Sequence, residues 1–200
     1  MVYPKDFYDL IENFKLFPGV GDKSAERFVY CVDEMTEDEV NAFAENLKKF
    51  KKNIKKCDIC GHYTSNNNIC SICSDKSRDL TTICVVEDSK SVFKFEMSGT
   101  YKGLYHVLGG LISPIDGINP EDINISNLIS KRLNENVKEV IIALAPSIEG
   151  ETTSLYLQKL LENKNVKVSR LSYGLPIGSD IEYLDPITLT KAIDDRKFIS

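Results

Sequence analysis

The stretch CDICGHYTSNNNICSICSD, residues 57–75, contains four cysteines in two CxxC pairs, and this pattern decides how the middle of the chain folds. The pairs are Cys57 with Cys60 and Cys70 with Cys73. Each CxxC turn presents two sulfurs on one side, and zinc accepts four thiolates in a tetrahedron. We therefore predict one structural zinc ion per chain. Four protein ligands leave no open coordination position, so the spacing argues against a catalytic zinc.

Two alternatives to this ligand set follow from the same residues. In a redox dithiol, one CxxC pair usually opens a helix in a βαβ setting, and neither pair here has that setting. His62 lies between the pairs and is the alternative fourth ligand. Gly61 follows the first pair and can adopt the positive φ angle that such a turn often needs.

The composition limits the class of protein. The chain has 200 residues, 42% of them hydrophobic, which suits one large domain or two small ones. Its net charge of -5 argues against coating nucleic acid by bulk charge, so any such binding must be local. The start has no signal-peptide pattern, and no later apolar run is long enough for a membrane span. We expect a cytoplasmic protein without a membrane partner.

Residues 1–56 are predicted to form a helical arm. Apolar residues recur at helical spacing in 3–17 and again in 18–32, with Pro18 separating the two helices. Thr36 and Glu39 match a capping box that opens a third helix over 37–54. That helix leads directly into the cysteine segment.

The pattern changes after the cysteines. Strands are expected at 80–88, 137–145 and 166–173, and helices at 89–97, 124–136 and 152–164. Alternating strands and helices are typical of an α/β fold, in which a parallel sheet has helices on both faces. We therefore predict a helical arm at 1–56, a four-cysteine zinc finger at 57–78, a sheet domain at 79–172 and a tail with a short helix at 173–200.

The turn between the first two helices is a candidate nucleic-acid site. Gly19 and Gly21 permit close approach to the start of the second helix, where free N–H groups and the helix dipole favour a phosphate. Lys23 and Arg27 lie four residues apart and would add two phosphate contacts. The stretch FPGVGDKSAERF resembles the helix-hairpin-helix motif, which binds DNA without reading its sequence. The alternative is a helix corner whose charges are only solvated.

A lysine run precedes the cysteines. Six lysines lie within residues 48–56, and Lys51, Lys52 and Lys55 are the proposed DNA contacts among them. Lysines at the end of a helix also stabilise it through the dipole and need no partner. The run is therefore either a phosphate-contacting stripe or a solvated helix end.

Four acids lie at or beyond the carboxyl ends of predicted strands, where open α/β sheets usually bind ligands. They are Glu87, Asp88, Glu149 and Glu151. Their placement resembles that of the Toprim domain, in which a glutamate and a DxD motif hold magnesium. Here the DxD position is Glu149-Gly150-Glu151, which moves the carboxylates outward and argues against catalysis. The acids are candidates for a magnesium site, for partner docking, or for exposed strand ends without a ligand.

The order of these parts resembles the RecR family of bacterial recombination mediators over essentially the whole chain. The stretches PSIEGETTSLYL and GLPIGSDIEYLD are also similar to that family. The resemblance implies a homo-oligomer, a tetramer or a dimer, that clamps double- and single-stranded DNA at the nucleoid. It also implies RecO and RecF as partners in loading RecA, and a tail that supports oligomerisation. The competing hypothesis is a small Toprim nuclease or primase-like enzyme that uses magnesium.

Overall fold

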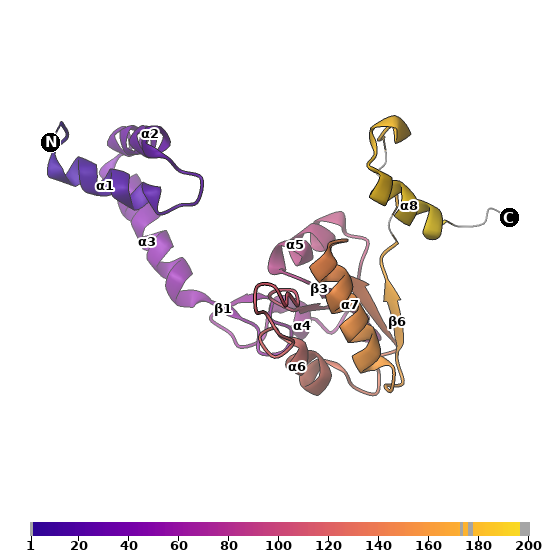
Figure 1. Cartoon of the computed structure of the whole chain (residues 1–200). Helices are drawn as coiled ribbons and strands as arrows, with labels where there is room; N and C mark the ends of the chain where they lie inside the picture. Colours follow the sequence, from indigo (N-terminus) through magenta and orange to yellow (C-terminus); the bar gives the residue numbers. More distant parts are fainter. Residues whose placement is uncertain (1, 173, 176–177, 197–200) are drawn as a thin grey trace. The chain divides into compact units, whose positions relative to one another are not determined.

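The computed structural model describes residues 2–172, 174–175 and 178–196 (Figure 1). The chain divides into two compact units, 1–53 and 54–200. The division falls just before the cysteine segment. Each unit is described by itself.

The first unit consists of three helices, as predicted. They are α1 (Lys5–Lys15), α2 (Asp22–Asp33) and α3 (Glu37–Asn53). Its small core consists of Ile11 from α1 and Ala25 and Val29 from α2, with aromatic side chains of α1 packed around them. The two helices also meet through Phe14 and Phe28, whose rings are in edge contact at 5.4 Å.

The third helix begins at the predicted capping box. Thr36 N donates to Glu39 Oε2 at 2.8 Å, and Glu39 N donates to Thr36 Oγ1 at 3.3 Å. The backbone donor of Thr36 lowers the pKa of Glu39. Helix α3 has no buried residue, and it exposes a row of apolar side chains at helical spacing: Phe43, Leu47 and Phe50.

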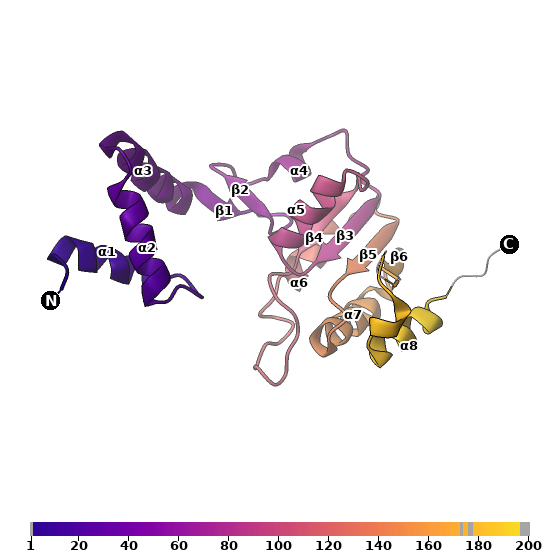
Figure 2. The ribbon, with the colours of Figure 1, turned by 90° about the horizontal axis from the view of Figure 1, so that it is seen from above.

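The second unit is built on a four-stranded parallel sheet (Figure 2). The strands are β3 (Thr82–Val86), β4 (Leu104–Val107), β5 (Glu139–Ala143) and β6 (Lys167–Arg170), in the order β4-β3-β5-β6. Three of them were predicted from the sequence, and β4 lies in a stretch to which the sequence analysis assigned no element. Parallel pairing confirms the predicted α/β class.

Helices cover both faces of this sheet. One face carries Ile83 and Val85 and packs against α7 (Ile148–Leu161), α6 (Ile125–Asn127) and the π-helical turn η1 (Leu128–Arg132). The other face carries Cys84 and Val86 and packs against α5 (Ser89–Ser98). Because Ile83 and Val85 point to one face and Cys84 and Val86 to the other, this alternation sets which helices cover each face. Burial on these faces stabilises the fold, since full burial of a leucine such as Leu157 contributes roughly 1.5–3 kcal/mol.

The cysteine segment is part of the second unit. It contains the antiparallel strands β1 (Ile54–Lys56) and β2 (Tyr63–Ser65) and the short helix α4 (Ser71–Ser74). The prediction of one helix through residue 54 was wrong by one residue, because pairing of Ile54 with Ser65 begins a strand there. Lys55 consequently lies on β1 and not at a helix end.

The tail ends in η2 (Ile181–Tyr183) and α8 (Pro186–Asp194), which confirms the predicted short helix. Asp185 caps α8 by accepting from Thr188 N at 3.0 Å. Parts of the predicted tail, residues 173, 176–177 and 197–200, lie outside the described residues. Within the described part of the chain, no helix is both long and apolar enough to cross a membrane.

Candidate metal centre and nucleic-acid interface

The four predicted cysteines lie together, with their sulfur atoms all within 4.8 Å of one another. Cys57 Sγ lies 3.9 Å from Cys73 Sγ, and Cys60 Sγ lies 3.6 Å from Cys70 Sγ. Sulfurs that surround zinc tetrahedrally at about 2.3 Å are about 3.8 Å apart. The sulfur positions therefore fit one tetrahedral metal ion.

The charge state of the sulfurs also favours a cation. The contact between Cys60 and Cys70 raises the pKa of Cys60 and lowers that of Cys70, since one sulfur donates to the other. Two thiolates this close repel each other, and a divalent ion among the four sulfurs would compensate their negative charge.

The turn around the first pair is held by the sheet domain. Gly61 has a φ of +75°, and a Cβ at this position would lie 2.8 Å from Val107 O. Val107 N in turn donates to Cys60 O at 2.7 Å. Three of the cysteines belong to the apolar core that covers the α5 face of the sheet. The cysteine segment, 54–75, is thus packed on the sheet, and we call it the knuckle below.

His62 is not one of the clustered ligand residues. It is buried beside α5, where its ring makes an edge contact with Phe93 at 5.0 Å between centroids. Its backbone N donates to Cys60 Sγ at 3.4 Å. The alternative in which His62 replaces a cysteine therefore has no support from this geometry.

The predicted phosphate site lies at the start of α2. Gly19 has a φ of +82°, and open space surrounds the positions where Gly19 and Gly21 would carry a Cβ. No side chain caps the first turn of α2. Lys23 and Arg27 are both exposed on this helix. The site thus has an open turn, an uncapped helix start and two exposed cations.

One charge at this site was missed in the sequence analysis. Asp22 is the first residue of α2, and its carboxylate lies 2.8 Å from Lys15 Nζ. The hydrogen bond from Lys15 lowers the pKa of Asp22. Lys15 also contacts Glu12 at 2.9 Å. This lysine therefore neutralises the acid nearest to the helix start.

The predicted lysine stripe is divided between two elements. Lys51 and Lys52 are exposed in the last turn of α3, whereas Lys55 and Lys56 lie on β1. Lys56 Nζ lies over the ring of Tyr63 at 4.1 Å from its centroid. Since α3 and β1 belong to different units, the structure does not define a single stripe.

The four predicted acids do not form a metal-binding cluster. Among the described residues, only the four cysteines bring three or more ligand atoms together. Asp88 is the N-cap of α5 and accepts from Ser91 N at 2.9 Å, a contact that lowers its pKa. Glu87 follows β3, while Glu149 and Glu151 lie in the first turn of α7. Acids in a first helical turn are favoured by the dipole without any ligand.

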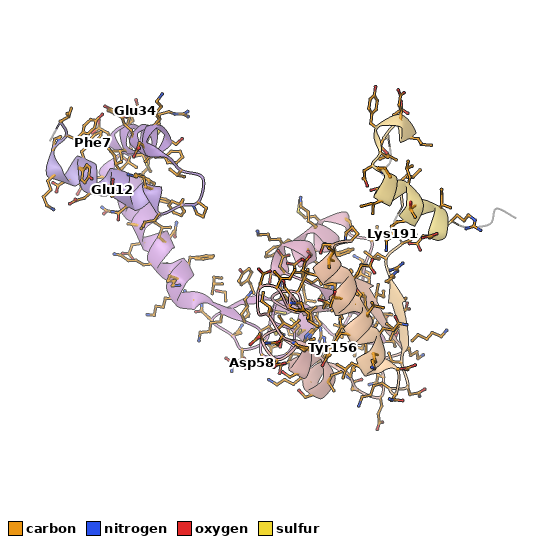
Figure 3. All side chains as sticks on the ribbon, viewed as in Figure 1. Phe7, Glu12, Glu34, Asp58, Tyr156 and Lys191 are labelled. Carbon is orange, nitrogen blue, oxygen red and sulfur yellow. The ribbon has the colours of Figure 1, made fainter. Side chains whose placement is uncertain are left out.

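Glu151 contacts two cations. Its Oε2 lies 3.3 Å from Arg170 Nη1 of β6. Its Oε1 lies 3.1 Å from Nζ of Lys191, the residue of α8 that is labelled in Figure 3. Gly150, next to it, is buried, and a Cβ there would lie 1.9 Å from Ala145 O. The backbone at Gly150 is therefore closely packed against Ala145. Of the two carboxylates at the altered DxD position, that of Glu151 is engaged in ion pairs.

A buried arginine was also missed. Arg132 ends η1 and is only 6% exposed, and its Nη2 donates to Tyr105 O at 2.8 Å. In the sequence it stands in SKRLNEN, a polar stretch typical of an exposed helix end. No signal in the sequence separates this arginine from a solvated one, because its burial depends on a strand 27 residues earlier.

Three family profiles match successive parts of the chain. The profile described as RecR, helix-hairpin-helix matches residues 7–51, and the Toprim domain profile matches residues 81–172. The profile described as RecR, C-terminal matches residues 174–197. The interval between the first two matches contains the knuckle cysteines. The order of motifs agrees with the predicted resemblance.

Relatives that align with nearly the whole chain also carry the RecR name. Two relatives named Recombination protein RecR, from Staphylococcus haemolyticus (strain JCSC1435) and Staphylococcus aureus (strain Newman), are each 48% identical to this chain over 196 residues. Each alignment covers 98% of this chain and 98% of the relative. The helix-hairpin-helix turn and the Toprim-type sheet are both present in the fold described above. The chain belongs to the RecR family of recombination proteins.

Proposed function

We propose that this chain is a DNA-binding recombination mediator. In this proposal it acts as a clamp that, with RecO and RecF, helps to load RecA onto single-stranded or gapped DNA. Its role is to hold DNA and partners, without catalysis of its own. Its place is the cytoplasm, at the nucleoid, where its DNA substrate lies.

The observation that carries the proposal is the start of α2. Lys23 and Arg27 are exposed there, next to a helix start without a side-chain cap. Backbone N–H groups at a helix start bind phosphate oxygens, and nearby cations add contacts that do not depend on base sequence. A site of this kind accepts double-stranded and single-stranded DNA. Lys51, Lys52 and Lys55 are the further proposed contacts.

The Toprim acids are proposed as a docking surface for a partner and not as a catalytic centre. Asp88 caps a helix, and Glu151 contacts Arg170 and Lys191. These contacts support the proposal because they occupy carboxylates that would otherwise hold magnesium. Purified protein should neither cleave nor extend DNA with magnesium, and Glu87→Gln should weaken binding to RecO or RecF. Magnesium-dependent cleavage would favour the competing enzyme hypothesis.

The metal of the knuckle is proposed to be zinc. Four thiolates in a tetrahedral arrangement are the ligand set of structural zinc sites. All four ligand positions belong to this chain, so the metal would stabilise the fold without reacting. The expected stoichiometry is one zinc per chain, measured by elemental analysis of purified protein.

Self-association is proposed through surfaces that the chain leaves uncovered. Phe43, Leu47 and Phe50 are about half exposed or more on α3, and α8 has no buried residue although it contains Ile187 and Ile193. Burial of such apolar surface against a second copy would stabilise a tetramer or a dimer. Deletion of residues 186–200 should lower the mass measured by light scattering if the tail takes part.

The proposed function is tested by RecA filament formation on single-stranded DNA coated with single-strand-binding protein. Adding this chain together with RecO should shorten the lag before filament growth. Lys23→Ala combined with Arg27→Ala should abolish that effect, since the clamp would no longer hold DNA. An equal lag with and without the unsubstituted chain would reject the mediator role.

A further inference from the structure

Arg132 is a buried cation that forms no ion pair with any described carboxylate. It is 6% exposed, and its Nε has no hydrogen-bond partner among the described residues. The described arginines that form ion pairs within 4.0 Å of a carboxylate are Arg78 and Arg170, not Arg132. An arginine side chain stays charged inside a protein, and an uncompensated buried charge is strongly destabilising. A negative charge near Arg132 would therefore stabilise this part of the fold.

The knuckle lies next to this arginine. Lys131, its neighbour in η1, donates from Nζ to Asp58 O at 3.0 Å, between the first two cysteines. The Arg132 guanidinium donates to the carbonyl of Tyr105, and Tyr105 shares an apolar core with the cysteines. Through these two contacts η1 is packed between the knuckle and the edge strand β4.

Arg132 also lies close enough to Cys73 for its positive charge to act on that cysteine. A divalent metal with four thiolates carries a net charge of about −2. With metal bound, the knuckle would therefore carry a net negative charge in the part of the fold where Arg132 is buried.

We propose that Arg132 is the buried counter-charge of the four-thiolate metal centre, and that it links metal binding to the docking of the knuckle on the sheet. Arg132 acts as a positioning residue and not as a ligand. The inference rests on the proposed zinc centre. Outer contacts of this kind change metal affinity by about 10- to 100-fold when they are removed.

The experiment uses the full chain with Arg132→Met, which keeps an unbranched apolar stem and removes the guanidinium charge. Zinc affinity is measured by competition with a chromophoric chelator, and the melting temperature is measured with zinc and after zinc removal. We expect Arg132→Met to weaken zinc binding at least about tenfold and to lower the melting temperature more with zinc than without it. Arg132→Lys, which keeps the charge, should retain most of the affinity.

Arg78→Met is the matched control. Arg78 is also largely buried and also donates to a backbone carbonyl, Gly103 O at 2.8 Å, but it is paired with Glu96. Its loss should lower the melting temperature equally with and without zinc. Equal zinc affinity of Arg132→Met and the unsubstituted chain would overturn the inference, as would equal destabilisation in both states. Absence of zinc binding by the unsubstituted chain would instead refute the metal centre itself.

Discussion

Lys191 Nζ lies 3.1 Å from Glu151 Oε1, and this ion pair joins the C-terminal helix α8 to the first turn of α7. Arg170 of β6 extends the contact, since its guanidinium reaches both Glu151 and Asp195. Helix α8 has no buried residue, so polar contacts have a large part in holding it. Helix α8 of the tail is therefore joined to α7 through Glu151, one of the two acids at the predicted DxD position.

Replacing Glu151 with glutamine should loosen α8. The carboxylate charge is lost, but the side chain keeps its size, and partly exposed ion pairs contribute at most about 1 kcal/mol each. Amide hydrogen exchange over residues 186–195 should become faster by roughly fivefold or more, as two pairs are weakened. Glu149→Gln, in the same helical turn, is the control. If both variants exchange equally, the Glu151 contacts do not hold the tail.

Gly150→Ala should destabilise the Toprim sheet. A Cβ at residue 150 would lie 1.9 Å from Ala145 O, a backbone atom that cannot rotate away. The loop before α7 must then shift, at a cost on the order of 1–3 kcal/mol. The measurement is urea unfolding. Gly174→Ala is the control, because open space surrounds that position, and equal midpoints for the two variants would contradict the packing argument.

Lys23→Ala combined with Arg27→Ala should weaken DNA binding without unfolding the first unit, since both side chains are exposed. Loss of two phosphate contacts should reduce the slope of log affinity against log salt by about 1.8 on duplex DNA. Fluorescence anisotropy over a salt series measures this slope. Lys5→Ala removes a lysine that is paired with Asp9 and serves as the control. An unchanged slope in the double variant would exclude the hairpin site.

The cysteine pattern was sufficient to predict that the four sulfurs cluster, because the four cysteines come from one short stretch. Three of the four sheet strands were also predicted, among them β3, whose residues Ile83 to Val86 form a continuous apolar run that is buried on both faces. Strand β4 was not predicted. The position of Lys55 could not be predicted. Lysine continues a helix pattern well, and only pairing with Thr64 places residue 55 on a strand.

Asp88 and Arg132 show why the roles of some site residues were not predicted from the sequence. Asp88 could have been predicted as a helix cap, because an aspartate three residues before Ser91 opens a helical stretch. Its position at the end of the predicted strand 80–88 favoured instead a role among the acids of the sheet edge. The burial of Arg132 carries no local signal, since its acceptor is a carbonyl on another strand. A helix cap can be predicted because it depends on neighbouring residues. The environment of a buried charge cannot, because it depends on residues that are distant in the sequence.

Cys57→Ser combined with Cys60→Ser should remove the metal and lower stability. Two of four ligands are lost, and structural zinc contributes on the order of 10 kcal/mol to folding of small zinc domains. The expected result is less than one zinc per ten chains and a lower melting temperature, measured by elemental analysis and calorimetry. Cys31→Ser is the control, because Cys31 is a free, exposed cysteine. Full stability of the double variant would mean that the knuckle folds without metal.

Stability should fall in mild acid because of His106. Burial lowers the pKa of His106 to about 4, whereas the unfolded chain has the ordinary value of 6.5. Between these values the unfolded chain binds a proton that the folded chain does not, so the free energy of unfolding decreases as pH falls from 6.5 towards 4. The decrease approaches roughly 1.4 kcal/mol per pH unit for one group. His106→Gln has no titrating ring and can still donate to Asn124 O. Urea unfolding at pH 7, 6 and 5 with zinc present should therefore give a shallower pH dependence for this variant, and the same slope in both proteins would assign the acid sensitivity to other groups.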